Sequence, residues 1–248
     1  MYHDTPHNVA EGDYFSVASA QLREQLSELR SQRRAGVALE SRIEAGSESN
    51  GVAITFDDGY ESNLRVALPI FAEMAMTATV FVVTDWVGTS RYCTWAQLRE
   101  LQSAGWSIQS HTASHPFLST LSEAALRHEL ADARREIEDR LGQAVVTLAL
   151  PNGDWPPSRF VSLVQDAGYR YIASSRWHSN SADDIRRGVL GRYTVRRSTT
   201  LAQFRSIISD LPGSWSREGM RLSALSAVRR VLGPHRYRNL RRQILARR

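Results

Sequence analysis

Short apolar runs alternate with amphipathic stretches through most of the chain. Residues 52–56 are nearly all apolar and stop abruptly at Asp57-Asp58-Gly59, as expected of a strand buried on both faces of a parallel sheet. Comparable runs predict further strands at residues 79–83, 106–109, 145–150 and 169–173. Helical spacing predicts helices between them at residues 64–76, 95–104, 120–142 and 159–167. We therefore predict a parallel α/β architecture, either a barrel or a doubly wound sheet.

Polar signals refine the predicted element ends. Thr120 and Glu123 have capping-box spacing and are expected to open the long helix that Gly142 closes. An amphipathic helix is also predicted within residues 13–35, before the first strand. In parallel α/β folds, ligands bind at the carboxyl ends of the strands. The conspicuous polar residues follow predicted strands, which places the candidate chemistry at one edge of the sheet.

Composition limits the class of protein. The 248 residues are 42% hydrophobic and 23% charged, which suits one catalytic domain with an appendage. No run approaches the roughly 18 apolar residues of a membrane span, and the first residues lack a secretory signal pattern, so a cytoplasmic location is expected. The single cysteine, Cys93, cannot form an internal disulfide or a thiolate metal site alone. Any metal must then be bound by His, Asp and Glu side chains.

Charge divides the chain into two predicted regions, residues 1–215 as the catalytic domain and 216–248 as a helical tail. Residues 217–248 hold ten Arg and one Glu, whereas the 216 residues before them carry 21 basic and 25 acidic side chains. The tail has leucines at helical spacing flanked by arginines, the composition of a helix pair at an anionic membrane surface. A helix docked on the barrel explains it equally well, and nucleic-acid binding is a weaker alternative.

Adjacent carboxylates at a strand end are costly unless a positive group lies beside them. A divalent cation could bind one of Asp57 and Asp58 and leave the other free as a base, although Asp-Asp-Gly is also common in solvated turns. His111 and His115 stand four residues apart after another predicted strand, close enough to converge on one ion. A His-His-carboxylate set suits zinc, and also iron, cobalt or nickel.

The segments Thr55-Phe56-Asp57-Asp58-Gly59 and Ser110-His111-Thr112-Ala113-Ser114-His115 resemble two motifs of the metal-dependent polysaccharide deacetylases, carbohydrate esterase family four. The resemblance covers roughly residues 1–210 and implies a distorted (β/α) barrel. It implies that Asp57 is the catalytic base and that Asp58, His111 and His115 bind a divalent metal, most simply zinc. The implied reaction is hydrolysis of N-acetyl groups on a sugar or polysaccharide.

Two family motifs are altered here. The third usually has an Arg that orients the base, where this chain has Ala149, as in the branch of poly-β-1,6-N-acetylglucosamine and exopolysaccharide deacetylases. Asp154 is expected either to share that orienting role or to cap the next helix. The fifth motif lacks the His that usually serves as general acid. By resemblance to the same branch, His3 is expected to be the general acid, with His178 in reserve.

The turn after the fourth predicted strand is expected to face the saccharide. Its substrate-binding candidates are Pro151, Asn152, Gly153, Asp154 and Trp155. An aromatic face such as Trp155 could stack on a pyranose ring at the mouth of the site. Two alternatives stay open at this point: an O-acetyl esterase acting through the same site, and a catalytically weakened carbohydrate-binding or assembly protein.

Overall fold

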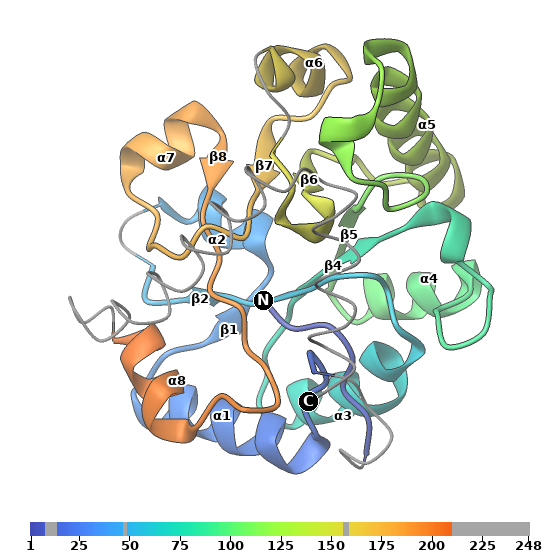
Figure 1. Cartoon of the computed structure of the whole chain (residues 1–248). Coiled ribbons are helices and arrows are strands. Elements are labelled where there is room, and N and C mark those ends of the chain that lie inside the picture. Colours follow the sequence, from blue (N-terminus) through green and yellow to red (C-terminus); the bar gives the residue numbers. More distant parts are fainter. Residues whose placement is uncertain (8–13, 47–48, 156–158, 210–248) are drawn as a thin grey trace.

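The computed structural model describes residues 1–7, 14–46, 49–155 and 159–209. Six parallel strands form the main sheet in the order β3-β4-β5-β6-β7-β8, which is also their order along the chain (Figure 1). Their bounds are β3 Thr55–Phe56, β4 Thr79–Val82, β5 Ser107–Ser110, β6 Thr147–Ala149, β7 Tyr171–Ala173 and β8 Val189–Leu190. A separate parallel pair consists of β1 Gly36–Val37 and β2 Val52–Ala53.

Residues Met1 and Tyr2 occupy the strand position between β3 and the segment after β8. The Tyr2 amide donates to Thr55 O (2.7 Å), and the Asp57 amide donates to Tyr2 O (2.9 Å). On the other side, the Val195 amide donates to Met1 O (2.9 Å). The curled sheet is therefore bridged between its first and last strands, and the predicted distorted (β/α) barrel is confirmed.

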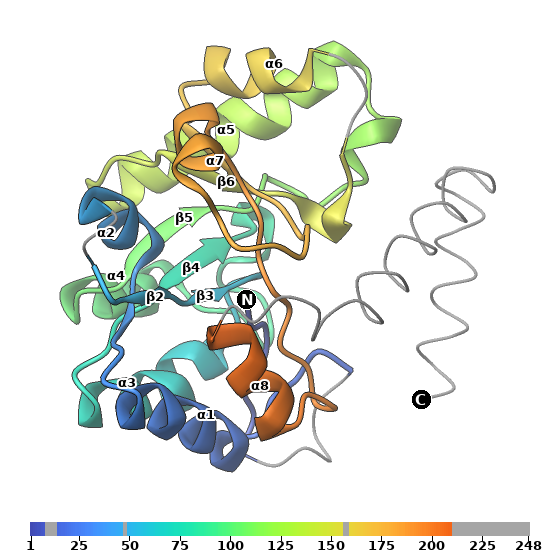
Figure 2. The ribbon, with the colours of Figure 1, turned by 90° about the vertical axis from the view of Figure 1, so that its left-hand side faces the viewer.

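Helices cover the outside of the barrel. They are α1 Ser19–Ser31, α2 Leu39–Glu44, α3 Leu68–Glu73 after a π-helical turn at Asn63–Ala67, α4 Trp95–Ser103, α5 Glu123–Leu141, α6 Phe160–Asp166, α7 Ala182–Arg187 and α8 Leu201–Ile208. α1 and α8, from opposite ends of the described chain, lie side by side, with an Arg205–Glu28 ion pair of 2.9 Å between them (Figure 2). Apolar side chains of most of these helices pack against the outer face of the strands in one continuous core. α2 and α7 are the exceptions, because Leu39 and Ile185 pack with a second cluster formed by inward-facing residues of the strands.

The inner face of the sheet is layered along the barrel axis. At the amino ends of the strands, the Glu40 carboxylate on α2 accepts hydrogen bonds from the hydroxyls of Thr79 and Thr147, both 2.7 Å. The next inward positions are apolar, formed by the buried residues Leu39, Phe81, Ala149, Ala173 and Leu190. The polar residues that follow the strands form the layer above. Each layer takes every second residue of a strand, because successive side chains of a β-strand point to opposite faces of the sheet.

Some predicted element ends were wrong. The run at 52–56 is two short strands, because the chain changes partner at Ile54: its amide donates to Val37 O, while its carbonyl accepts from the Thr79 amide. The long helix begins at Glu123 and is capped by Ser122, whose hydroxyl accepts from the Ala125 amide (3.2 Å), rather than by Thr120. Its predicted end at Gly142, in the left-handed conformation, is confirmed.

Asp154 does not cap α6, which begins at Phe160 after Arg159. The predicted tail at residues 216–248 lies outside the described residues, so its helices and its boundary stay predictions. Within the described ranges, no helix has both the length and the apolar character that a bilayer crossing needs.

Candidate metal centre and active site

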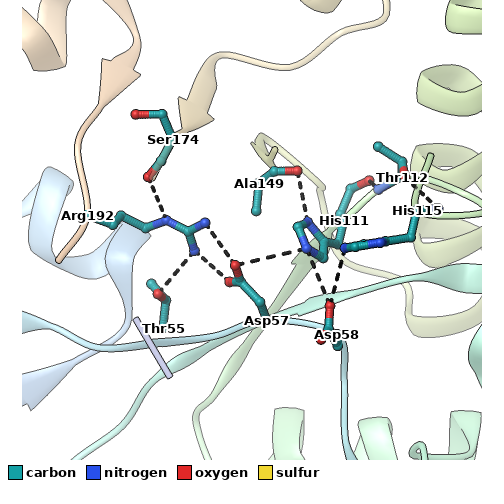
Figure 3. Close-up of polar contacts among 10 residues, drawn as sticks. Thr55, Asp57, Asp58, His111, Thr112, His115, Ala149, Ser174 and Arg192 are labelled. Carbon is teal, nitrogen blue, oxygen red and sulfur yellow. Dashed lines mark hydrogen bonds and ion pairs between the residues drawn. The ribbon is translucent and has the colours of Figure 1, made fainter. Parts of the chain in front are cut away.

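The carboxyl ends of the strands bring the predicted chemistry together (Figure 3). At most of the strand ends, β4 excepted, lies a polar residue of the site or a backbone group that contacts one. These are His3 after the Met1–Tyr2 segment, Asp57 after β3, His111 after β5, Ala149 at the end of β6, Ser174 after β7 and Arg192 after β8. The site is thus built from strand ends across nearly the whole sheet, as in other parallel barrels.

Asp58, His111 and His115 converge with one ligand atom each, all within 4.8 Å of one another. Asp58 Oδ1 lies 3.5 Å from His111 Nε2 and 3.6 Å from His115 Nε2. Asp58 and His115 both have left-handed backbone, with φ of 75° and 60°, which turns these side chains toward His111. Such conformations are costly for residues with a Cβ and concentrate at functional sites.

His111 is oriented by the strand next to its own. Its Nδ1 lies 2.9 Å from Ala149 O, so Nδ1 carries the hydrogen and Nε2 presents its lone pair to Asp58 and His115. Burial lowers the pKa of His111, although the nearby Asp57 charge and the Ala149 hydrogen bond oppose the shift. A neutral imidazole with an exposed Nε2 lone pair is the form that binds a metal ion.

The three donors fit a divalent cation. Zinc bonds His nitrogen and carboxylate oxygen at about 2.1 Å, so ligands of a tetrahedral site lie about 3.4 Å apart, close to the separations seen here. Two imidazoles and one carboxylate leave coordination positions open, the pattern of catalytic rather than structural zinc. The donor set is also compatible with iron, cobalt or nickel.

Asp57 is turned away from this set and forms a buried ion pair with Arg192. Arg192 Nη1 and Nη2 donate to Asp57 Oδ1 (2.6 Å) and Oδ2 (3.0 Å), and the two residues are 6% and 3% exposed. Asp57 Oδ2 also lies 4.0 Å from His111 Nε2. Burial alone would raise the pKa of Asp57, but Arg192, His111 and His3 together outweigh it and hold that pKa below its usual range. Asp57 is therefore ionised beside the three candidate metal ligands.

Arg192 is itself fixed on every side. Its Nε donates to Ser174 O (3.1 Å), its Nη1 also donates to Thr55 Oγ1 (3.2 Å), and its guanidinium lies 5.1 Å from the Phe81 ring centroid. The sequence pattern did not predict Arg192 for this position. Asp154, the candidate considered for the orienting role, accepts from the Ser119 amide. The local signal was an Arg two residues beyond the last strand, which does not indicate that Asp57 is its partner.

His3 lies close enough to Asp57 and His111 for their charges to act on it. Its ring contacts the Phe15 ring in a tilted arrangement at a centroid distance of 4.8 Å, and its backbone carbonyl accepts from Asn63 Nδ2 (3.0 Å). Burial lowers the pKa of His3 to about 4, with Asp57 opposing the shift. The reserve candidate, His178, packs against Gly191, and its Nδ1 lies 2.9 Å from Ser179 O.

The predicted substrate-binding turn forms a 3-10 turn, Pro151–Gly153, directly after β6. Asn152 has φ of 59°, and Asp154 is fully buried, with Oδ2 accepting from the Ser119 amide (2.8 Å). Trp155 is half-buried, meets Phe160 edge-on and has the Arg176 guanidinium 4.6 Å from its ring centroid. Asp154 therefore anchors the turn, while Trp155 and Arg176 form a joint aromatic and cationic surface.

The fold and the Asp-His-His site define a polysaccharide deacetylase, and the family model of that name matches residues 45–172. The chain belongs to the polysaccharide deacetylase family, in which metal-dependent removal of acetyl groups from sugars is general. It is 33% identical over 146 residues to YxkH of Bacillus subtilis (strain 168), which carries the family's name; the match covers 59% of this chain and half of that protein.

A second relative and a solved structure of the same fold match more of the chain. A chitooligosaccharide deacetylase of Rhizobium leguminosarum bv. trifolii is 25% identical over 205 residues, 81% of this chain and 92% of that protein. The fold is also that of the Streptococcus pyogenes deacetylase PplD, solved in complex with acetate, with a TM-score of 0.74 and 21% identity over 84% of this chain and 96% of that one.

Replacing Arg192 by Met is expected to lower the free energy of unfolding by about 3–5 kcal/mol, because Asp57 would stay buried without its counter-charge. Arg192→Lys should lose less, since one charged donor remains. Urea unfolding of the metal-free protein measures both, and Arg176→Met, an exposed arginine at the same rim, is the control. A loss no larger than that of the control would contradict the importance of the ion pair.

The partly buried, neutral His3 should make the fold less stable in acid. With a folded pKa of about 4 and an unfolded pKa near 6.5, the unfolded chain binds more protons between these values. Stability should be retained above pH 6.5 and fall by about 2 kcal/mol between pH 7 and 4.5 through this group alone. His3→Gln should reduce the measured pH dependence by that amount in denaturant titrations, whereas the exposed His7→Gln should not.

Proposed function

We propose that this protein is a metal-dependent N-deacetylase that hydrolyses acetamido groups on an N-acetylated saccharide. The observation that carries the proposal is an ionised Asp57, held by Arg192, beside the Asp58–His111–His115 donor set. One carboxylate is thus free to act as a base while its neighbour can bind a metal. We propose zinc as that metal.

Each residue of the site has its own role in the proposed reaction. A divalent cation bound by Asp58, His111 and His115 would polarise the acetyl carbonyl and acidify a water molecule. Asp57 takes the proton from the attacking water, and Arg192 fixes the direction of its carboxylate. His3, neutral in the resting site, accepts that proton from Asp57 and passes it to the leaving nitrogen, so that the C–N bond breaks and acetic acid and the amine are formed. The second proton of the water leaves with the acetic acid, which ionises to acetate and gives that proton to the amine or to solvent.

The alternative of a catalytically weakened carbohydrate-binding or assembly protein is less well supported. That alternative rested on two departures, the absent Arg at Ala149 and the absent late His. Arg192 contacts the base from another strand, and His3 lies within electrostatic reach of it, so each missing function has a candidate residue. An O-acetyl esterase remains a second candidate because the same donors would serve an ester.

For the substrate, we propose that Trp155 and the Pro151–Gly153 turn contact a pyranose ring. The Arg176 guanidinium covers part of the Trp155 indole, so the sugar would bind beside this pair, with its hydroxyl oxygens accepting hydrogen bonds from the guanidinium edge. A β-linked N-acetylglucosamine oligomer is the proposed substrate class, supported by the chitooligosaccharide deacetylase name of the relative from Rhizobium leguminosarum.

The basic segment at residues 216–248 supports a further proposal from sequence alone. Its arginines and regularly spaced leucines would suit an anionic membrane surface, and a peripheral position at the inner face of a membrane would follow from that. A helix docked on the barrel is the competing explanation for the same pattern.

Acetate release tests the activity directly. The metal-loaded protein should release acetate from β-1,6- or β-1,4-linked N-acetylglucosamine oligomers in preference to acetylated xylan. Asp58→Ala should lose both metal and activity, whereas Asp57→Asn should keep the metal and lower kcat by about 10²-fold or more. Asp85→Asn, an exposed carboxylate after β4, is the matched control. No acetate from any substrate despite bound metal, or full activity of Asp57→Asn, would refute the proposal.

The Trp155 contact should appear mainly in KM. Trp155→Ala is expected to raise KM about tenfold, with a smaller change in kcat, because the contact between the indole and the sugar is lost equally in the ground and transition states. Trp95→Ala is the control, since Trp95 is also half-buried with an arginine, Arg140, over its ring at 5.9 Å, but lies on α4. Equal effects of the two substitutions would argue against a sugar contact at Trp155.

A further inference from the structure

The loop that supplies two of the three candidate metal ligands has a costly backbone conformation. Between His111 and His115, Thr112 has φ of 71° and His115 has φ of 60°. Within the loop, Thr112 Oγ1 accepts from the His115 amide (3.1 Å). On one side, the Thr84 and Asp85 amides donate to Thr112 O (3.3 Å) and Ala113 O (3.0 Å). These contacts pair the carbonyls of Thr112 and Ala113 and the amide of His115. The amides of Ala113 and Ser114 are paired by a different group.

Glu129 supplies that pairing from α5. Its Oε2 accepts from the amides of Ala113 (3.0 Å) and Ser114 (2.9 Å), and its Oε1 accepts from Ser114 Oγ (2.5 Å). Successive amides that point to one side form a concavity that binds an anion, and here the anion is a carboxylate of the same chain. Three charge-assisted hydrogen bonds thus fix the two residues that lie just before His115.

Glu129 is presented by a rigid part of the fold. Its neighbours on α5, Leu126 and Leu130, are buried in the core. Leu130 O accepts from the Tyr169 hydroxyl (2.9 Å), and the Tyr169 oxygen is left to accept from the hydroxyl of Ser110 (2.9 Å), one residue before His111. The loop is therefore connected to α5 at both of its ends, through Ser110 at the start and through Glu129 near His115.

We propose that Glu129 is a positioning residue that holds the 111–115 loop in its ligating conformation before a metal ion binds. This rests on the proposed function only for the identity of the site as a metal centre. Removing the carboxylate would let Thr112 and His115 relax to unstrained backbone, so that metal binding would have to restore the left-handed turns. The lost affinity is then the free energy of reordering the loop, and Glu129 touches neither metal nor substrate.

The first test needs no metal. In metal-free protein, hydrogen exchange of the Ala113 and Ser114 amides should be at least tenfold faster in Glu129→Gln than in the unmodified chain. The glutamine keeps the size, but its neutral oxygen accepts from the two amides more weakly than a carboxylate, and its amide nitrogen replaces Oε1 as the partner of Ser114 Oγ. Glu123→Gln, which loses the same charge on the same helix, is the control and should leave the two amides protected. Unchanged exchange in Glu129→Gln would overturn the proposal.

The second test is zinc affinity measured by competition with a chromophoric chelator. Glu129→Gln should weaken binding about 10–100-fold, as is usual when a residue supporting the ligands is lost. Ser114→Ala, which removes one hydrogen bond of the three, should weaken it only a few-fold, and Glu123→Gln should not change it. The absorption spectrum of the cobalt-substituted protein should broaden in Glu129→Gln, which a purely global loss of stability would not produce.

The outcomes separate this inference from the proposed function. If the unmodified protein binds zinc but Glu129→Gln binds it equally well, the positioning role is wrong and the metal centre stands. If the unmodified protein binds no zinc, the proposed function fails, while the exchange of the Ala113 and Ser114 amides still decides whether Glu129 fixes the loop.

Discussion

The buried ion pair between Asp57 and Arg192 is the interaction on which the arrangement of the site depends. Asp57 follows the first strand of the main sheet and Arg192 follows the last, with the Met1–Tyr2 segment between them. The pair therefore links the two edges of the curled sheet at its functional end. Two charges this well buried are tolerable only with near-complete hydrogen bonding, which the bidentate contact and the bonds to Thr55 and Ser174 supply. The direction of the Asp57 carboxylate is thus a consequence of barrel closure.

The interior of the barrel explains why that pair can exist. The apolar layer at Phe81, Ala149, Ala173 and Leu190 separates the Glu40 carboxylate at the amino ends from Asp57 at the carboxyl ends. Arg192 rests on the Phe81 ring, so one face of its guanidinium is covered by an aromatic side chain and its edges are left for oxygen acceptors. Small side chains at positions 149 and 173 leave the inner space to Phe81 and Arg192. The arginine that contacts Asp57 therefore comes from the segment after the last strand, whereas the family motif usually has an arginine at the position of Ala149.

The sequence was sufficient for the parts of the site that are local. Asp57 and Asp58 end one apolar run and His111 and His115 follow another, so strand placement and spacing together predicted that Asp58, His111 and His115 would lie close together, as they do. Arg192 is 135 residues from Asp57, and nothing in its own neighbourhood indicates that the two strands meet. Element ends failed for the same reason: Ile54 changes strand partner within an unbroken apolar run, and Ser122 rather than Thr120 caps α5 because Leu118–Thr120 forms its own turn. These features depend on contacts between residues far apart in the sequence, and the local sequence pattern does not show such contacts.

Several residues at the carboxyl ends of the strands have a strained backbone conformation. Asp58, Thr112, His115 and Asn152 all adopt left-handed backbone without being glycine, and all lie at the carboxyl ends of the strands. Each such conformation costs on the order of 1 kcal/mol or more, which the fold must offset through contacts elsewhere. For Asp58 the offset comes from its position directly after the closed edge of the barrel, and for the 111–115 loop from α5 and the turn after β4. Because the folded chain already offsets this strain, the site needs little reordering when a cation binds. More of the binding free energy therefore remains as affinity.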